Sequence, residues 1–488
     1  MSASPNPSGP SLETILLAVV VVYVAALRLF YDINAPAMGD EAYYWMWGQR
    51  LGWSYFDHPP LDAWLQAGIA AIFGWSTVSL RLLTWLTLGG NLAILWLWAQ
   101  QLAPERNREL FLRTAAILLT VPVIALFTFA AFHDHLLVFF AVLAMYALWR
   151  FAEAWGHGRG GIRFLYLAGA AIGLATLSKY NGALLGVGAL SLFVFQRSLW
   201  GSLRTPHPYL AGLLAIIIQT PVIYWNLTEG FATLSYHFVE RPSNHWNHPA
   251  LMQGVGFVAQ SFIAAGPILM LAALRFPWVM RDDRSRRQRA VSVAVFLGAS
   301  LVVLAASLFT DILLHWNIVA YVALAMAGSW LLGRWLIWPQ IAMGLYLMTV
   351  AIWNYSVAPA PVPGFLDPAA PANYGWAEVA KAAQTAKTQH PGAFLAATKY
   401  NYAAQLGFAL HTLDVTAINP LRSQYDLWWQ PVSHIGQDGI IVADAINPIS
   451  LSSAWFTSMA KLTDVPVIVG GKQVWTFEIY LGQGYHPR

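Results

Sequence analysis

The chain is dominated by apolar stretches that are separated by short polar loops. A helix that spans a bilayer needs roughly 17–25 predominantly apolar residues. About eleven stretches come near this length, at residues 12–32, 78–101, 110–131, 135–155, 163–178, 182–196, 209–226, 251–274, 291–308, 317–333 and 336–355. Hydrophobic residues make up 58% of the 488 positions and charged residues only 10%. We therefore expect a polytopic α-helical membrane protein and exclude a single soluble core.

Arginine is concentrated in alternate loops between these stretches. The loops concerned contain Arg106, Arg108 and Arg113; Arg150, Arg159 and Arg163; Arg197 and Arg204; six arginines between Arg275 and Arg289; and Arg334. Short loops rich in Lys and Arg face the cytoplasm. We therefore expect a multi-pass membrane protein whose other loops face outward, away from the cytoplasm. Because these arginines form no continuous basic face, nucleic acid is excluded as a partner.

The first outward loop, residues 33–78, contains an acidic pair in an otherwise apolar region. Asp40 and Glu41 stand side by side, and Tyr44, Asp57 and His58 follow them. Residues 40–50 and 60–73 are typical of short amphipathic helices that lie along a membrane surface. A helix cap at Asp40, with Glu41 favoured by the helix dipole, is the structural alternative and explains one carboxylate. Charged groups at membrane depth are usually functional, so we expect the active site here.

Further polar clusters fall in the other outward loops. Asp134 lies between His133 and His135, and the alternatives for it are a helix cap or a metal ligand. Neighbouring residues at a helix start point in different directions, so the two histidines are not expected to share one ion. Lys179 is the only lysine in the first 380 residues. Its ammonium suits a phosphate oxygen, although snorkelling to the lipid headgroups is the structural alternative.

Two clusters lie nearer the end of the membrane region. His237 and Arg241 occupy the loop between the seventh and eighth apolar stretches, where arginine is otherwise absent. Arg241 could bind a phosphate or a sugar carboxylate, or pair with Glu240. His315 begins a polar and aromatic trio at the start of the tenth stretch.

The composition changes after the last apolar stretch. Residues 357–371 contain five prolines and are predicted to be a linker after the membrane domain of residues 1–356. Residues 372–488 contain five of the six lysines and no spanning segment. A helical pattern at residues 374–390 and strand-like runs at 394–398, 439–443, 465–469 and 474–480 predict a small extracytoplasmic α/β domain.

The acidic-pair motif and the Tyr55-Phe56-Asp57-His58-Pro59-Pro60 motif resemble those of the polyprenyl-phosphate-sugar glycosyltransferases of the GT-C fold. Within them the chain is similar to the group that contains protein O-mannosyltransferases and lipid A aminoarabinose transferases. Asp134, Lys179 with Tyr180, and His315 also resemble the pattern of this group.

The resemblance implies inverting transfer of a single sugar from a polyprenyl-phosphate donor. By carry-over, Asp40 is the general base, Glu41 and Asp134 position hydroxyls, and Lys179 and Arg241 neutralise the donor phosphate. The residues expected to bind substrate or support the site are Tyr44, Tyr55, Asp57, His58, Tyr180, His237 and His315. No metal or other cofactor is required; a divalent cation is the alternative, which the spacing of the ligands does not support.

Several functions remain open at this stage. The short C-terminal α/β domain, in place of the lumenal repeat domain of eukaryotic protein mannosyltransferases, favours an envelope glycolipid such as lipid A or the lipopolysaccharide core as acceptor. A protein acceptor is the alternative. A lipid or sugar transporter or flippase is the alternative of another class, but the chain has no internal repeat and its acidic residues lie at one face. A membrane sensor would leave the first outward loop unexplained.

Overall fold

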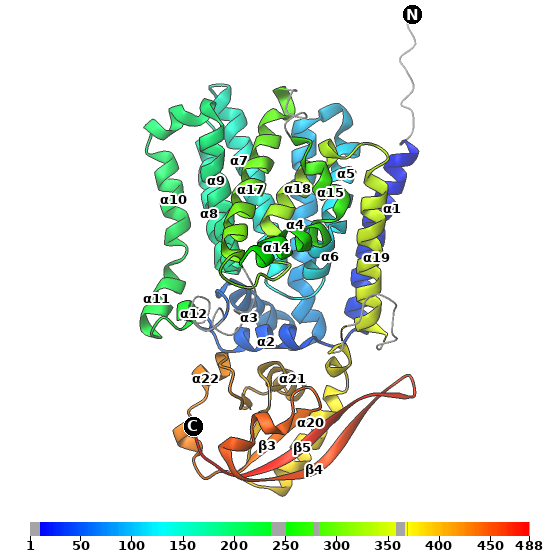
Figure 1. The fold of residues 1–488 in the computed structure, drawn as a ribbon, viewed down its shortest axis with the longest axis vertical. Helices are drawn as coiled ribbons and strands as arrows, with labels where there is room; N and C mark the ends of the chain where they lie inside the picture. Colours follow the sequence, from blue (N-terminus) through cyan, green and yellow to red (C-terminus); the bar gives the residue numbers. More distant parts are fainter. Residues whose placement is uncertain (1–9, 236–249, 277–282, 358–366, 368, 488) are drawn as a thin grey trace, which may run out of the picture.

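The computed structural model describes residues 10–235, 250–276, 283–357, 367 and 369–487. A bundle of helices carries a smaller domain at one end, which is formed by the C-terminal part of the chain (Figure 1). The helices α2 (Gly39–Gln49) and α3 (Leu61–Phe73) lie where the bundle meets this domain. They correspond to the two short helices that the sequence predicts in the first outward loop.

Helices cover all eleven predicted stretches. Four of them, within the described residues, are long and apolar enough to cross a membrane: α1 (Leu12–Asn34), α4 (Thr77–Leu102), α7 (Asp134–Gly156) and Arg286–Ser307 of α17 (Asp283–Ser307). Four bent pairs are long enough when each is taken as one span. The first two are η1 (Pro104–Arg106) and α5 (Asn107–Thr120) with α6 (Pro122–Thr128), and η2 (Tyr180–Gly182) and α9 (Ala183–Phe195) with η3 (Arg197–Arg204). The other two are α10 (His207–Ile217) with α11 (Thr220–Thr228), and α14 (Ala250–Ala265), from Leu251 onward, with α15 (Pro267–Ala273). The rest of the bundle is α8 (Ile162–Ser178), α12 (Ala232–Ser235), α18 (Ile318–Leu331) and α19 (Ile337–Ser356). The described residues thus support four spans, or up to eight with the bent pairs, and the number eleven stays a prediction.

Three of the bends coincide with prolines. Pro122, Pro221 and Pro267 stand in the first turn of α6, α11 and α15, where the chain bends by 74°, 45° and 112°. Proline lacks a backbone N–H and clashes with the preceding turn, but it fits the first turn of a new helix. The apolar stretches are therefore continuous in sequence but broken in the structure.

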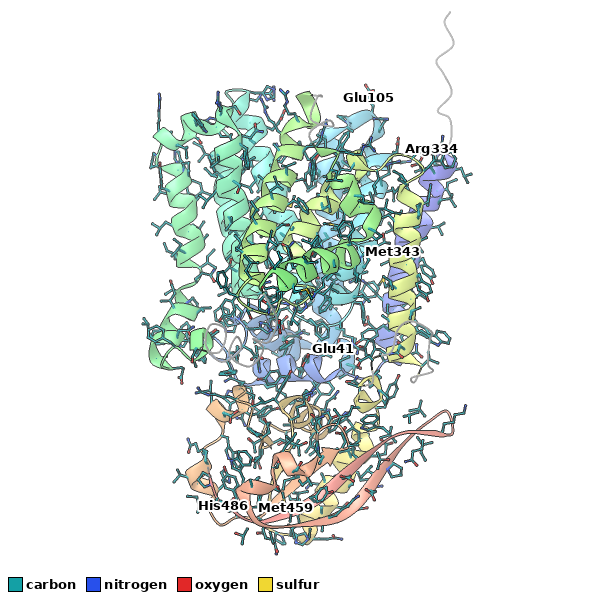
Figure 2. The ribbon with its side chains drawn as sticks, in the orientation of Figure 1. Glu41, Glu105, Arg334, Met343, Met459 and His486 are labelled. Atoms are coloured by element: carbon teal, nitrogen blue, oxygen red, sulfur yellow. The ribbon has the colours of Figure 1, made fainter. Side chains whose placement is uncertain are left out.

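The described arginines of these loops gather at the end of the bundle opposite to α2. Arg113 and Arg334 both form ion pairs with Glu13 at the start of α1. Arg159 and Arg197 line one hollow of about 860 Å³ together with residues of α17. Figure 2 shows Glu105 and Arg334 at the end of the bundle farthest from Glu41. These arginines thus share one side, as expected; that this side is cytoplasmic stays a prediction.

The C-terminal domain is built around a five-stranded sheet of order β2-β1-β3-β5-β4. The strands are β1 (Phe394–Ala397), β2 (Thr416–Ala417), β3 (Gly439–Asp444), β4 (Phe456–Val469) and β5 (Lys472–Tyr485), with helices η5 (Ala370–Asn373), α20 (Trp376–Gln389), α21 (Tyr400–Leu410) and α22 (Gln424–Trp428). β1 pairs in parallel with β2 and β3, whereas β5 pairs antiparallel with β3 and β4. A mixed α/β domain is confirmed, although β4 and β5 form a longer hairpin than the sequence predicts.

The C-terminal domain is packed directly on α2. Tyr43, Trp45 and Trp47 belong to the same hydrophobic core as Leu395 and Tyr402 of the domain. The backbone N–H of Gly39 donates to the Asn373 side chain at 3.1 Å. A Cβ atom at Gly39 would lie 2.9 Å from the Asn401 side chain, so this close approach requires glycine. The start of α2 is therefore held between the bundle and the domain.

The close approach at Gly39 predicts that Gly39→Ala lowers the stability of the folded protein by about 1–3 kcal/mol, because the added methyl group overpacks the junction. Thermal unfolding of the purified protein measures this as a lower Tm. Gly68→Ala in α3 is the matched control, since nothing lies within 4 Å of its Cβ position. Equal Tm values for the two variants would contradict the tight junction.

Candidate active site

The two carboxylates of the acidic pair have different surroundings. Glu41 is fully buried, and both of its oxygens accept hydrogen bonds from Arg81, at 3.1 and 2.8 Å. It also accepts the backbone N–H groups of Met38 and Ala131 at 2.9 and 2.8 Å and the hydroxyl of Tyr31 at 3.2 Å. Burial by itself raises the pKa of Glu41, but Arg81 and the two backbone N–H groups outweigh it and hold the pKa below its ordinary value.

Glu41 therefore connects four segments of the chain and is saturated within the protein. Arg81 also donates to the backbone carbonyls of Tyr31, Ala35 and Pro36, so the pair ties the end of α1 to α2 and α4. The sequence predicts that Glu41 positions a substrate hydroxyl. The geometry does not support that role, because no oxygen of Glu41 is left without an internal donor.

Asp40 is only partly buried, and its hydrogen-bond partner belongs to the C-terminal domain. The hydroxyl of Tyr400, the first residue of α21, donates to Asp40 Oδ1 at 3.1 Å. Burial raises the pKa of Asp40, while the Tyr400 hydrogen bond and the charge of Lys399 oppose this rise without cancelling it. Met38, not Asp40, is the N-cap of α2, so capping does not account for the Asp40 carboxylate.

Tyr44 of α2 marks the centre of the site. Burial raises the pKa of its hydroxyl well above the ordinary range, and the charges of Asp40, Asp57 and Asp134 raise it further. These three carboxylates, two from the first outward loop and one from the second, therefore lie near one side chain. The Tyr44 ring also packs edge-on against His133, with centroids 4.1 Å apart.

The second and third outward loops meet at a buried ion pair. Lys179 Nζ lies 2.7 Å from Asp134 Oδ2, and both side chains are almost completely buried. Asn181 donates to the backbone carbonyl of Trp316 at 2.5 Å, which brings the turn after α8 against the turn before α18. Lys179 is thus not a snorkelling residue exposed at a helix end, because its charge faces a carboxylate in the interior.

The remaining predicted residues fall into three groups. His58 lies at the centre of the site, with its ring 4.5 Å from His133 and 5.7 Å from Tyr44. Three others lie at the edges of the site. Tyr55 stacks on Trp47 and donates to its backbone carbonyl, and Tyr180 packs beside Leu61 and Leu177. The His315 ring lies against Phe127, with ring centroids 4.5 Å apart. His237 and Arg241 lie outside the described residues.

Three contributors to the site are not singled out from the sequence. Arg81 had a signal, since it is a charged residue at the outward start of an apolar stretch. His133 stands in the His-Asp-His motif, where only Asp134 is assigned to the site. Tyr400 had no signal, because it is 360 positions from Asp40 in an ordinary helix of another domain.

The residues that the structure describes contain no group of three or more His, Asp or Glu side chains that could hold a metal ion. The expectation that no metal or cofactor is required stays a prediction.

Part of the chain is similar in sequence to known proteins. Residues 57–225 match the family model described as dolichyl-phosphate-mannose-protein mannosyltransferase. The lipid A galacturonosyltransferase RgtD of Rhizobium johnstonii is 27% identical to the chain over 316 residues. The match covers 62% of this chain and 61% of that relative, so it spans less than two thirds of the relative's length.

Solved structures match nearly the whole chain. ArnT from Cupriavidus metallidurans bound to undecaprenyl phosphate superposes with a TM-score of 0.65 and 15% identity, over 96% of this chain and 97% of ArnT. The apo form of ArnT gives a TM-score of 0.62 over 96% and 98% of the two chains. The chain therefore has the same fold as ArnT, in agreement with the GT-C type of fold that the sequence predicts. The resemblance inferred from the sequence is thereby confirmed.

The Glu41–Arg81 pair predicts that Glu41→Gln lowers the stability by roughly 3–5 kcal/mol, because the buried guanidinium loses its closest counter-charge and keeps only Asp32 at 4.0 Å. The yield of folded protein and its Tm measure this effect. Asp40→Asn is the matched control, since Asp40 is less buried and has no ion pair among the described residues; it is expected to keep a Tm near that of the wild type. A fully stable Glu41→Gln variant that is inactive would instead support direct contact of Glu41 with substrate.

Proposed function

We propose that the protein is an inverting glycosyltransferase that moves a single sugar from a polyprenyl-phosphate donor to an envelope glycolipid, lipid A or the lipopolysaccharide core, at the periplasmic face of the inner membrane. The observation that carries this proposal is the position of the Asp40 carboxylate. It is partly exposed where the bundle meets the C-terminal domain, near the buried side chains of Asp134 and Lys179. The GT-C fold supports the reaction class.

Asp40 is the proposed general base. It takes the proton of the acceptor hydroxyl as the oxygen forms its bond to the anomeric carbon and the bond from that carbon to the phosphate oxygen breaks. Burial raises the pKa of Asp40, which makes its carboxylate a stronger base than that of an exposed aspartate. Glu41 is unsuited to this step, since its ionised form is already stabilised by Arg81.

Lys179 is the proposed partner of the leaving phosphate. The buried Asp134 carboxylate fixes its ammonium at 2.7 Å, which orients the cation without exposing it to water. In such a low-dielectric site a fixed positive charge stabilises the charge that develops on the phosphate. Arg241, outside the described residues, is proposed to assist.

The substrates are supported by the relatives. The ArnT structure similar in fold contains undecaprenyl phosphate, which supports a polyprenyl-phosphate donor. RgtD is a lipid A galacturonosyltransferase, which supports a lipid A acceptor. The family model is described by protein mannosylation, so a protein Ser or Thr is the second acceptor to test.

Transfer of radiolabel from polyprenyl-phosphate sugars to extracted lipid A tests the proposal with the purified protein. Asp40→Asn is expected to lower the rate by about 10²–10⁴-fold, because the general base is lost. Asp414→Asn, an exposed aspartate of the C-terminal domain paired with Lys387, is the control and should retain the wild-type rate. Transfer by Asp40→Asn at the wild-type rate would overturn the assignment of the base, and transfer only to protein would favour the alternative acceptor.

Replacing the buried pair as a whole tests the phosphate site. The double variant Asp134→Asn with Lys179→Met leaves no unpaired buried charge, so the fold is expected to survive. Donor binding should weaken by about tenfold or more, as expected for one lost hydrogen bond to a charged group. Binding of fluorescent polyprenyl-phosphate analogue, with Tm as the folding control, measures this. Wild-type donor affinity in a folded double variant would remove Lys179 from the site.

A further inference from the structure

One contact to the proposed base comes from outside the membrane bundle. The Tyr400 hydroxyl, at the first residue of α21 in the C-terminal domain, donates to Asp40 Oδ1 at 3.1 Å. Among the described residues no hydrogen bond is found to Asp40 Oδ2. One oxygen of the carboxylate is therefore held, while the other remains available to accept a proton.

We propose that the C-terminal domain completes the active site, with Tyr400 as the positioning residue that orients the Asp40 carboxylate for proton transfer. The inference rests on the proposed function and extends it, because it gives the small extracytoplasmic domain a part in the reaction. A hydrogen bond to Oδ1 fixes the rotation of the carboxylate, so that the lone pairs of Oδ2 keep one direction.

Several contacts fix the C-terminal domain against α2, so that Tyr400 can hold the Asp40 carboxylate in place. Gln405 of α21 donates to the backbone carbonyl of Ala37 at 2.5 Å, just ahead of α2. The Tyr400 ring packs on Tyr43, with centroids 4.5 Å apart. At the start of α22, the backbone N–H of Gln424 donates to the Tyr43 hydroxyl at 2.8 Å, and the Gln424 side chain accepts the N–H of Phe56 at 2.7 Å.

Contacts at both α21 and α22 thus hold the domain against the first outward loop. Attachment at these two points keeps the Tyr400 hydroxyl at a fixed position relative to the Asp40 carboxylate. A loosely tethered domain could not provide a fixed hydrogen bond to a reacting group.

The groups around Asp40 determine how its titration responds to a change at Tyr400. Tyr400 and Lys399 face it from α21, Glu41 and Tyr44 from α2, and Tyr355 from α19. Burial raises the pKa of Asp40, the Tyr400 hydrogen bond and the Lys399 charge lower it, and the charge of Glu41 raises it. Loss of the Tyr400 hydroxyl therefore raises the pKa further, and the base stays protonated to a higher pH.

The test is the pH dependence of kcat/KM for sugar transfer by the full-length protein. In Tyr400→Phe the acidic limb of the profile should move upward by about one pH unit, as expected when a hydrogen bond to a charged group is lost. The rate should recover part of its loss at high pH. Lys399→Gln should move the limb in the same direction, because it removes a charge that stabilises the ionised carboxylate.

Tyr402→Phe is the matched control. Tyr402 lies in the same helix, and its hydroxyl donates to Asp444 at 2.5 Å and accepts from Asn447 at 3.0 Å, all within the domain. This variant loses a buried hydrogen bond without touching Asp40, so its acidic limb should coincide with that of the wild type.

Two results would overturn the inference: an unchanged acidic limb in Tyr400→Phe, or the same shift in Tyr402→Phe. Neither result would affect the proposed function, which fails separately if wild-type protein transfers no sugar or Asp40→Asn remains active.

Discussion

The buried ion pair between Glu41 and Arg81 is the interaction on which the rest of the site depends. It joins the end of α1, the start of α2, the start of α4 and the backbone at Ala131, just before the loop that carries His133 and Asp134. A buried pair of this kind is stable only when its remaining hydrogen-bonding capacity is met, and backbone groups meet it here. The adjacent Asp40 lies in the same first turn of α2, at the junction with the C-terminal domain.

The two neighbouring carboxylates thereby have different surroundings. Glu41 is enclosed and fully bonded, whereas Asp40 points toward Tyr400 and keeps one oxygen without a described hydrogen bond. The Asp134–Lys179 pair is a second buried ion pair, in which the carboxylate holds the ammonium at 2.7 Å. Tyr44 lies close enough to Asp40, Asp57 and Asp134 to respond to all three charges.

The sequence predicts the helical membrane bundle, the short helices of the first outward loop and the C-terminal α/β domain, because apolar period and charge placement are local signals. It also predicts that Asp40, Asp134 and Lys179 belong to outward loops, although only the structure brings Asp134 and Lys179 into contact. The role of Glu41 could not be predicted, since its partner Arg81 is 40 positions away. The contact of Tyr400 with Asp40 could not be predicted either, because a local sequence pattern does not indicate contacts between two domains. The bent helices show that the number of membrane spans cannot be derived from the lengths of the apolar stretches alone.

The central claim is that Asp40 and Lys179 act on the two sides of one sugar–phosphate bond. A structure of the Asp40→Asn variant with a polyprenyl-phosphate sugar bound tests this most directly. The account predicts that the phosphate lies within hydrogen-bonding distance of Lys179, and that the anomeric carbon faces residue 40 across a space for one acceptor hydroxyl. A donor whose phosphate lies away from Lys179, or whose sugar points away from residue 40, would contradict it.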